Sequence, residues 1–223
     1  MFSLAKNCRQ KTTTLKKLKK PPLKKIANAV LKRVFDILFS GFIIVFFLSW
    51  MLPLFALIIK LQSTGPVIYK QLREGKDGVH FMCFKFRTMH LNDESDYSWT
   101  KVNDPRVTRF GVFLRRTSLD EFPQFLNVFL GHMSIVGPRP HPIKLNDLYR
   151  DNIEKFSLRH ATRPGVTGLS QMKGYRGSIT HYHQINSRVK LDRFYIQNWT
   201  FLLDLKIILL TIPATIHWGL SSK

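Results

Sequence analysis

Cysteine and acidic residues are scarce in this chain of 223 residues. Its two cysteines, Cys8 and Cys83, show no zinc-ligand spacing, which argues against a disulfide framework or a structural zinc site and favours a reducing compartment. Cys83 lies in an apolar stretch and is expected to be a small core residue. The chain also lacks the Gly-x-x-x-x-Gly-Lys phosphate loop, the Gly-x-Gly-x-x-Gly dinucleotide turn and the His-Glu-x-x-His metal pair.

The shortage of acid leaves a strong positive charge. Fourteen Asp and Glu face 35 Lys and Arg, which gives a formal net charge of +21. Residues 1–33 contain eleven of the basic residues and no acid. Such a run attracts polyanions, either nucleic acid or the anionic cytoplasmic leaflet of a membrane. A solvated tail without a dedicated partner explains the run equally well.

An uncharged apolar segment follows at residues 37–59. Its 23 residues are enough to cross a hydrocarbon core of about 30 Å as a helix. The run is too long for a signal peptide, and no small-x-small cleavage site follows it. Basic residues lie on both sides, so the positive-inside rule does not exclude a cytoplasmic location for either end.

Pro53 interrupts this segment and is expected to bend it. The residues alone leave two alternatives open: a bent helix that enters and leaves by the same face, and a kinked helix that spans the bilayer. Asp36, at the start of the segment, is expected to pair with Arg33 or Lys32 near the interface.

Residues 61–223 have the pattern of one globular domain of the α+β class, mostly helical. Residues 67–69 and 79–86 predict a small β-hairpin around a glycine turn. Helices are expected over 110–130, 145–157 and 183–197, and Gly131 is expected to end the first of them. The apolar run 199–218 carries Asp204 and Lys206 near its start, which favours an amphipathic helix lying in the membrane interface over a second span.

Asp120 and Glu121 form the most informative pair in the chain, because Arg115 and Arg116 precede them closely. A carboxylate can attack phosphorus or hold a metal, and guanidiniums neutralise phosphoryl oxygens. Two structural roles compete with catalysis. Glu121 could complete a capping box with Ser118, or Asp120 could itself cap a helix. Both roles place the carboxylates at a helix N-terminus, which favours anions.

Further cations lie in segments bounded by glycine, proline or strand ends: Lys85, Arg87 and Arg139. Each of them alone is more typical of a charged surface. If they converge with Arg115 in a buried cluster, that cluster is hard to explain without an anionic ligand. The acidic loop 92–101 contains Asp93, Glu94 and Asp96, for which solvation is a simpler explanation than a metal site.

The order of motifs resembles that of the bacterial sugar transferases, which are monotopic polyprenyl-phosphate phosphoglycosyl transferases. The resemblance runs from Lys32 to about Ile212. The motifs are Lys32-Arg33-Val34-Phe35-Asp36, Gly65-Pro66-Val67, Lys85-Phe86-Arg87-Thr88-Met89, Asn103-Asp104-Pro105-Arg106-Val107-Thr108, Ser118-Leu119-Asp120-Glu121, Asn127-Val128, Met133-Ser134-Ile135-Val136-Gly137-Pro138-Arg139-Pro140, Arg163-Pro164-Gly165-Val166-Thr167-Gly168 and Asn198-Trp199.

This resemblance implies a function and a set of roles. Asp120 corresponds to the nucleophile that attacks the β-phosphorus of a UDP-sugar, releases UMP and passes the sugar phosphate to undecaprenyl phosphate. Glu121 corresponds to the partner that positions or activates the acceptor phosphate. Mg²⁺ is the implied cofactor, with Asp120 as its ligand. Arg115 and Arg139 are implied phosphate or nucleotide ligands, and Lys85, Arg87 and Arg116 are further substrate-binding candidates.

The resemblance also implies an organisation in three parts: a basic tail (1–26), a re-entrant membrane helix (27–60) and a catalytic domain (61–223) on the cytoplasmic face of the bacterial inner membrane. Relatives often carry Ser-Pro at the bend, whereas this chain has Leu52-Pro53 about one helical turn later. Gly174-Tyr175-Arg176-Gly177, Asp204-Leu205-Lys206-Ile207-Ile208 and Pro140-His141-Pro142 look most like segments of glucose-1-phosphate transferases. The resemblance therefore implies glucose 1-phosphate as the transferred group, and hence exopolysaccharide or O-antigen synthesis.

Other functions remain open on the residues alone. A membrane-anchored scaffold that recruits polyanions also fits the charge. A nucleic-acid-binding module fits less well, because the chain has no recognised motif for it, and no nucleic-acid partner is expected. The sequence leaves open whether the chain forms a homodimer.

Overall fold

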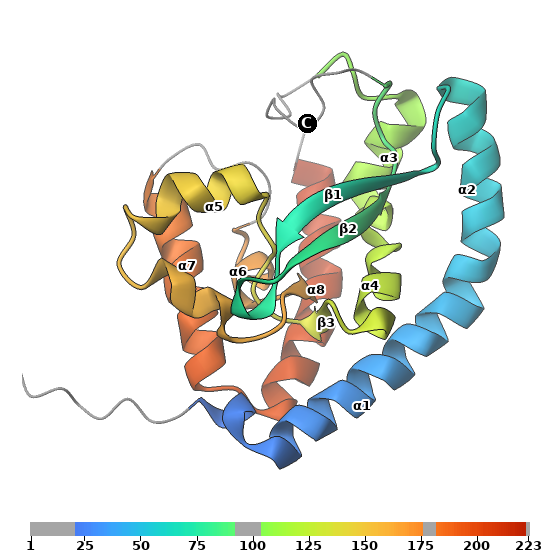
Figure 1. Cartoon of the computed structure of the whole chain (residues 1–223). Coiled ribbons are helices and arrows are strands. Elements are labelled where there is room, and N and C mark those ends of the chain that lie inside the picture. Colours follow the sequence, from blue (N-terminus) through green and yellow to red (C-terminus); the bar gives the residue numbers. More distant parts are fainter. Residues whose placement is uncertain (1–20, 92–103, 176–181, 222–223) are drawn as a thin grey trace, which may run out of the picture.

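The computed structural model describes residues 21–91, 104–175 and 182–221 (Figure 1). These residues are mostly helical, and they include two small two-stranded sheets. The predicted α+β class with a small hairpin is therefore confirmed. The basic tail and the acidic loop with Asp93, Glu94 and Asp96 lie outside the described residues.

The apolar segment forms one long helix. After a 3₁₀ turn (Pro22–Lys24), α1 (Ile26–Ile43) continues through a π-helical turn (Ile44–Leu48) into α2 (Ser49–Gln62). Within the described part of the chain, this is the one helix that is long and apolar enough to cross a membrane, by length and composition. The helix changes direction between α1 and α2 (Figure 1). Two known causes of bending lie close together here: the π-helical turn and Pro53, five residues beyond its end.

Both halves of this helix pack against the rest of the molecule. Met51 and Phe55 of α2 belong to a buried cluster with Phe86 and Leu114. On α1, Arg33 donates to the carbonyl oxygens of Val128 and Phe129, 2.7 and 2.8 Å away. The opposite side of the helix exposes large apolar side chains, among them Val34, Leu38, Phe42, Phe46, Leu54 and Leu57.

Asp36 does not pair with a neighbouring cation as predicted. Its Oδ1 accepts hydrogen bonds from the Ser134 hydroxyl and the Ile135 amide, each at 3.0 Å. Lys32 instead binds Asp204, with 2.5 Å between Nζ and Oδ2. The expected pairing was wrong because the segments around Ser134 and Asp204, distant in sequence, offer these groups buried partners.

The hairpin consists of β1 (Ile68–Glu74) and β2 (His80–Phe86), antiparallel with Ile68 opposite Phe86. A 3₁₀ turn (Lys76–Gly78) connects the strands, and Asp77 has a left-handed φ of 53° there. Cys83 is fully buried in the main core, which confirms its expected structural role.

The predicted helix over 110–130 is divided in two. α3 (Arg109–Thr117) ends at Ser118, whose φ of 58° is left-handed, and α4 (Gln124–Leu130) begins after Pro123. A 3₁₀ turn (Leu119–Glu121) lies between them. Helical periodicity continues across the break, so it did not reveal the interruption.

The chain then forms β3 (Ser134–Val136), α5 (Ile143–Arg150), a 3₁₀ helix (Phe156–Ala161), β4 (Gly165–Thr167), α6 (Leu169–Met172), α7 (Tyr182–Gln197) and α8 (Phe201–Ser221). Because α5 ends at Arg150, the helix expected over 145–157 is shorter than predicted, whereas α7 matches its prediction. The parallel pair β3–β4 was not predicted. A Cβ on Gly165 would lie 2.1 Å from the Gly137 nitrogen, so this contact requires glycine.

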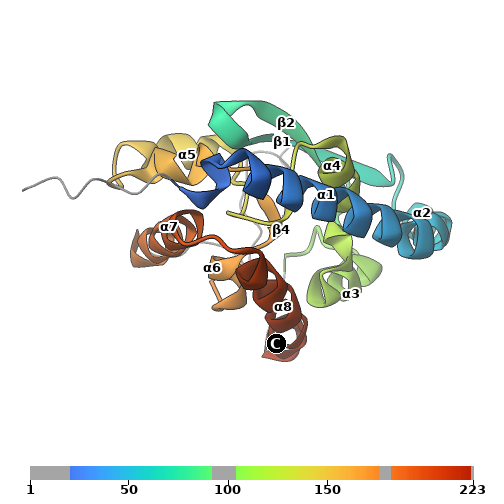
Figure 2. The ribbon, with the colours of Figure 1, turned by 90° about the horizontal axis from the view of Figure 1, so that it is seen from below.

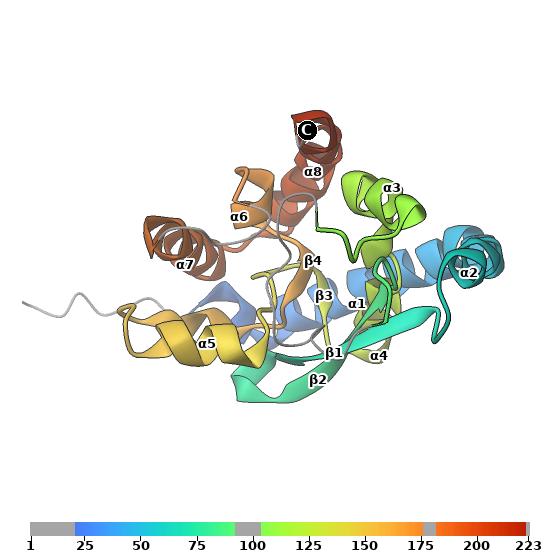
Figure 3. The same ribbon diagram turned by 90° about the horizontal axis from the view of Figure 1, so that it is seen from above.

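The hairpin and α8 lie on opposite sides of the molecule, with β3 and β4 between them (Figures 2 and 3). Trp199, Asp204 and Ile207 are buried against the core, whereas Leu202, Leu209 and Ile212 of α8 are exposed. An apolar outer face of this kind suits the predicted interfacial location, which stays a prediction.

Candidate active site

Asp120 and Glu121 lie in the 3₁₀ turn between α3 and α4. Neither structural role weighed from the sequence is present. Ser118 makes no side-chain cap hydrogen bond to this turn, and the residue before α4 is Pro123 rather than Asp120. The break in the helix at Ser118 instead presents both carboxylates to strand β2 and to the loop after β3.

Glu121 binds two cations from different parts of the fold. Its Oε1 lies 2.6 Å from Lys85 Nζ of β2 and 2.5 Å from Arg139 Nη2, and its Oε2 accepts from Arg139 Nη1 at 3.1 Å. The exposed fractions are small: 10% for Glu121, 17% for Lys85 and 22% for Arg139. Burial alone would raise the pKa of Glu121, but the charges and hydrogen bonds of Arg139 and Lys85 hold it well below the ordinary value.

Asp120 is placed differently. Lys85 Nζ lies 4.0 Å from its Oδ2, and the carboxylate makes no hydrogen bond to the described part of the chain. Its side chain is 13% exposed. Burial and the charge of Glu121 raise the pKa of Asp120, while Lys85, Arg115 and Arg139 lower it, and the net shift is upward. Neighbouring carboxylates with pKa values moved apart are typical of catalytic sites.

Three of the predicted cations therefore converge on the carboxylate pair: Lys85, Arg139 and Arg115. Arg115 donates from Nε to the Thr88 hydroxyl at 2.8 Å, and its charge acts on Asp120. Arg116, the next residue of α3, is exposed.

Arg87 lies elsewhere. Its guanidinium donates to the Ser63 carbonyl oxygen at 2.7 Å and to that of Thr64. These carbonyls directly follow α2, so Arg87 connects the end of the long apolar helix to the end of β2. Its predicted contact with substrate stays a prediction, and the structure gives it a structural role.

A second group of buried cations was missed from the sequence. Arg159 donates to the Arg139 carbonyl oxygen at 2.7 Å and to Asp192 Oδ2 at 2.9 Å, and it contacts His141. Arg73 donates to the Pro140 carbonyl oxygen. Burial, Arg139 and Arg159 lower the pKa of Arg188 to about 10. These residues are spread over β1, the 3₁₀ helix and α7, so no local motif reveals them.

Among the described residues, positive charge is concentrated behind Arg139, where Arg73, Arg159 and Arg188 are buried near the carboxylates of Glu121 and Asp192. Burial together with the neighbouring arginines keeps the pKa of His141 well below its ordinary value. Buried positive charge is costly unless anions offset it. A diphosphate has the charge and the oxygen acceptors to do so.

A magnesium ion fits Asp120 only in combination with a substrate. Among the described residues, no group of three or more His, Cys, Asp or Glu is arranged to hold a metal. Mg²⁺, however, is commonly bound by one or two carboxylates together with substrate phosphates. Asp120 supplies such a carboxylate, because the described side chains around it make no hydrogen bond to its oxygens.

Comparison with known proteins identifies the family of this chain. A family described as bacterial sugar transferase matches residues 27–218. The chain is 47% identical over 187 residues to a UDP-glucose:undecaprenyl-phosphate glucose-1-phosphate transferase of Klebsiella pneumoniae, covering 83% of this chain and 40% of the relative. It is 42% identical over 194 residues to a protein of the same name from Caulobacter vibrioides, covering 86% of this chain and 72% of the relative.

An exopolysaccharide production protein of Rhizobium leguminosarum bv. phaseoli is 45% identical over 197 residues, which cover 86% of this chain and 98% of that protein. The chain thus spans about two fifths of the Klebsiella relative but nearly the whole Rhizobium protein. The matched range includes the long helix, the carboxylate pair and all the cations around it. This chain belongs to the bacterial sugar transferase family.

Proposed function

We propose that this chain transfers glucose 1-phosphate from UDP-glucose to undecaprenyl phosphate and releases UMP, as a first membrane step of exopolysaccharide, O-antigen or capsule synthesis. The observation that carries the proposal is the state of Asp120: a buried carboxylate with no hydrogen bond to the described residues, beside cations that Glu121 holds in place. The names of the Klebsiella and Caulobacter relatives support the choice of donor and acceptor.

In the first step, a carboxylate oxygen of Asp120 attacks the β-phosphorus of the UDP-sugar. A bond forms between that oxygen and phosphorus, the bond from phosphorus to the bridging oxygen breaks, and UMP leaves with the bonding electrons. Lys85, Arg115 and Arg139 stabilise the negative charge on the phosphoryl oxygens. The same cations oppose the effect of burial on the pKa of Asp120, which favours the ionised nucleophile.

In the second step, a phosphate oxygen of undecaprenyl phosphate attacks the phosphorus bound to Asp120. The acyl phosphate bond breaks and returns the carboxylate. Glu121 contributes by position: its two oxygens hold Lys85 and Arg139 where an incoming phosphate needs them. Its strongly lowered pKa makes it a poor proton acceptor at neutral pH, so it positions the acceptor phosphate through its cations.

Asp120 would hold a magnesium ion in this scheme, together with the bound substrate. When bound there, the ion supplies charge that offsets the diphosphate. The protein groups that carry the remaining charge are Lys85, Arg115 and Arg139.

The long helix is proposed to be re-entrant, with both ends and the catalytic domain on the cytoplasmic face of the inner membrane. The bend between α1 and α2, the packing of both halves against one globular body and the exposed apolar outer side support this arrangement. A straight span would carry one half away from the body that it contacts. Basic residues on both flanks are consistent with a cytoplasmic location of both ends.

Substitution Asp120→Asn tests the chemistry. With UDP-glucose and undecaprenyl phosphate, UMP release is expected to fall on the order of a thousandfold or more, because an amide cannot act as the nucleophile. Asp77→Asn is the matched control, since Asp77 is 69% exposed in the hairpin turn and asparagine tolerates its left-handed backbone.

In the absence of acceptor, the intact mass of the unsubstituted protein should increase by one hexose phosphate, and that of the Asp120→Asn variant should not. Unchanged turnover in Asp120→Asn would refute the assigned nucleophile, whereas an absence of turnover in the unsubstituted protein would favour a scaffold function. A panel of UDP-sugars identifies the donor.

A further inference from the structure

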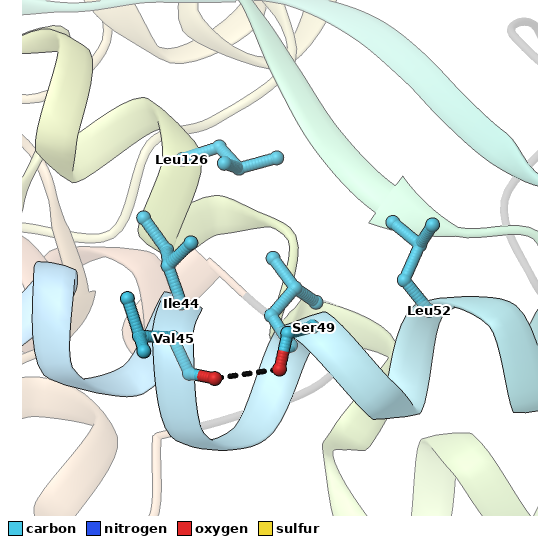
Figure 4. Close-up of a pocket in the computed structure, with 6 residues that line it drawn as sticks. Ile44, Val45, Ser49, Leu52 and Leu126 are labelled. Atoms are coloured by element: carbon cyan, nitrogen blue, oxygen red, sulfur yellow. Dashed lines mark hydrogen bonds between the residues drawn. The ribbon is translucent and has the colours of Figure 1, made fainter.

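An apolar groove lies at the bend of the long helix. Its lining residues are Ile44, Val45, Leu48, Ser49, Leu52 and Leu126, and its volume is 390 Å³. Figure 4 shows Ile44, Leu52 and Leu126 pointing into the space between the helix and α4. Val45 and Leu52 at its edge are 62% and 37% exposed. The groove therefore presents carbon surface to a medium that, on the proposed function, is the hydrocarbon of the membrane.

The π-helical turn shapes this groove. Ile44, Val45 and Leu48, half of the lining, belong to that turn, and the Ser49 hydroxyl donates to the Val45 carbonyl oxygen at 2.5 Å just beyond it. π-helical turns are rare because their hydrogen bonding is less favourable, and they occur frequently at functional sites. A regular α-helix would place these side chains in a different register against Leu126.

Apolar packing connects the walls of the groove with the active-site turn. Leu119 and Phe122, which flank the carboxylate pair, pack against the same apolar cluster as Ile44 and Leu126, and Leu48 belongs to that cluster. Leu126 follows Glu121 by five residues, which is about 8 Å along a helical path. A ligand whose phosphate binds Lys85 and Arg139 can therefore extend its attached hydrocarbon chain into the groove.

We propose that this groove binds the isoprenoid units of the acceptor lipid nearest its phosphate. This inference rests on the proposed function and assigns residues to the recognition of the acceptor chain. The phosphate is held by Lys85 and Arg139, and the chain runs past Leu126 into the bend at Ser49. The bend thus serves the reaction by guiding the lipid phosphate towards the carboxylate pair, beyond anchoring the protein.

The test fills the groove without disturbing the catalytic groups. Ser49→Phe places an aromatic ring in it, whereas Ser49→Ala removes the hydroxyl and leaves it open. Leu57→Phe adds a ring on the exposed outer side of the same helix, where Leu57 is 61% exposed. Each full-length variant is assayed with undecaprenyl phosphate and with the phosphate of a two-isoprene prenol, and UMP release without acceptor is measured in parallel.

Ser49→Phe is expected to reduce the ratio of kcat/KM for the long acceptor to that for the short one about tenfold, which corresponds to the lost burial of about two methylene groups. Ser49→Ala and Leu57→Phe should keep the unsubstituted ratio, and UMP release without acceptor should be the same in all four proteins.

An unchanged ratio in Ser49→Phe overturns the inference. It is also overturned if that variant changes only its retention in phospholipid vesicles, which would indicate a bilayer acyl chain in the groove, or only its oligomeric state, which would indicate a second copy. If the unsubstituted protein releases no UMP from UDP-sugars, the proposed function itself fails, which is a distinguishable result.

Discussion

Replacing Glu121 by glutamine removes the negative charge that binds both Lys85 and Arg139 while keeping the size of the side chain. All three side chains are largely buried, so the change leaves two cations without their counter-charge. Removing one partner of a buried ion pair costs about 3–5 kcal/mol, and we expect about 3 kcal/mol because Lys85 and Arg139 retain some contact with solvent. For a chain of this length that corresponds to a decrease in Tm of about 9 °C.

The pH dependence of this loss follows from the pKa of Glu121. Because the folded-state pKa lies well below the ordinary value of 4.5, the stabilisation is complete above that value and disappears as the pH falls through the folded pKa. The difference in Tm between the two proteins should therefore be constant near neutral pH and shrink in acid. Thermal unfolding in detergent micelles measures it, with Glu154→Gln as the control, since the Glu154 side chain is 80% exposed and its substitution should leave Tm unchanged.

The same substitution has a kinetic signature. The charge of Glu121 raises the pKa of Asp120, so its removal lowers that pKa and moves the acid limb of the kcat/KM profile to lower pH. The value of kcat/KM itself should fall, because Lys85 and Arg139 lose the carboxylate that positions them. An unchanged Tm, or an acid limb moved to higher pH, would refute this account of the carboxylate pair.

Two further substitutions separate structural from catalytic arginines and lysines. Arg87→Ala should lower Tm, because the carbonyls of Ser63 and Thr64 lose their donor. The KM for UDP-glucose should stay near that of the unsubstituted protein. A KM increase on the order of tenfold with unchanged Tm would instead place Arg87 in the substrate site. Lys32→Met should destabilise the protein by about 3–5 kcal/mol, because Asp204 then becomes a buried charge without its cation. The double variant Lys32→Met with Asp204→Asn removes that charge, and its Tm should return towards that of the unsubstituted protein.

The candidate chemistry was inferred from residue type and order. The unbroken apolar run determined the long helix, and adjacent carboxylates between basic motifs determined the candidate site. The resemblance then attached a role to each residue. Local hydrophobic periodicity also predicted the hairpin and α7, because these elements depend on contacts between residues close in sequence.

The tertiary structure decided which charges meet. Lys85 and Arg87 are two residues apart, yet Lys85 reaches Glu121 while Arg87 binds the end of α2. Asp36 and Lys32 find partners about 100 and 170 residues away rather than each other. Arg73, Arg159 and Arg188 gather behind Arg139 only through packing of β1, the 3₁₀ helix and α7.

The sequence by itself therefore determined the kinds of groups available and the long apolar helix, since composition and periodicity are local properties. Only the fold decided that the helix over 110–130 breaks at Ser118 to present Asp120, and that the long apolar helix makes a π-helical turn before Pro53. Both features depend on long-range packing, because the energy that stabilises an unfavourable backbone conformation comes from contacts with distant parts of the chain.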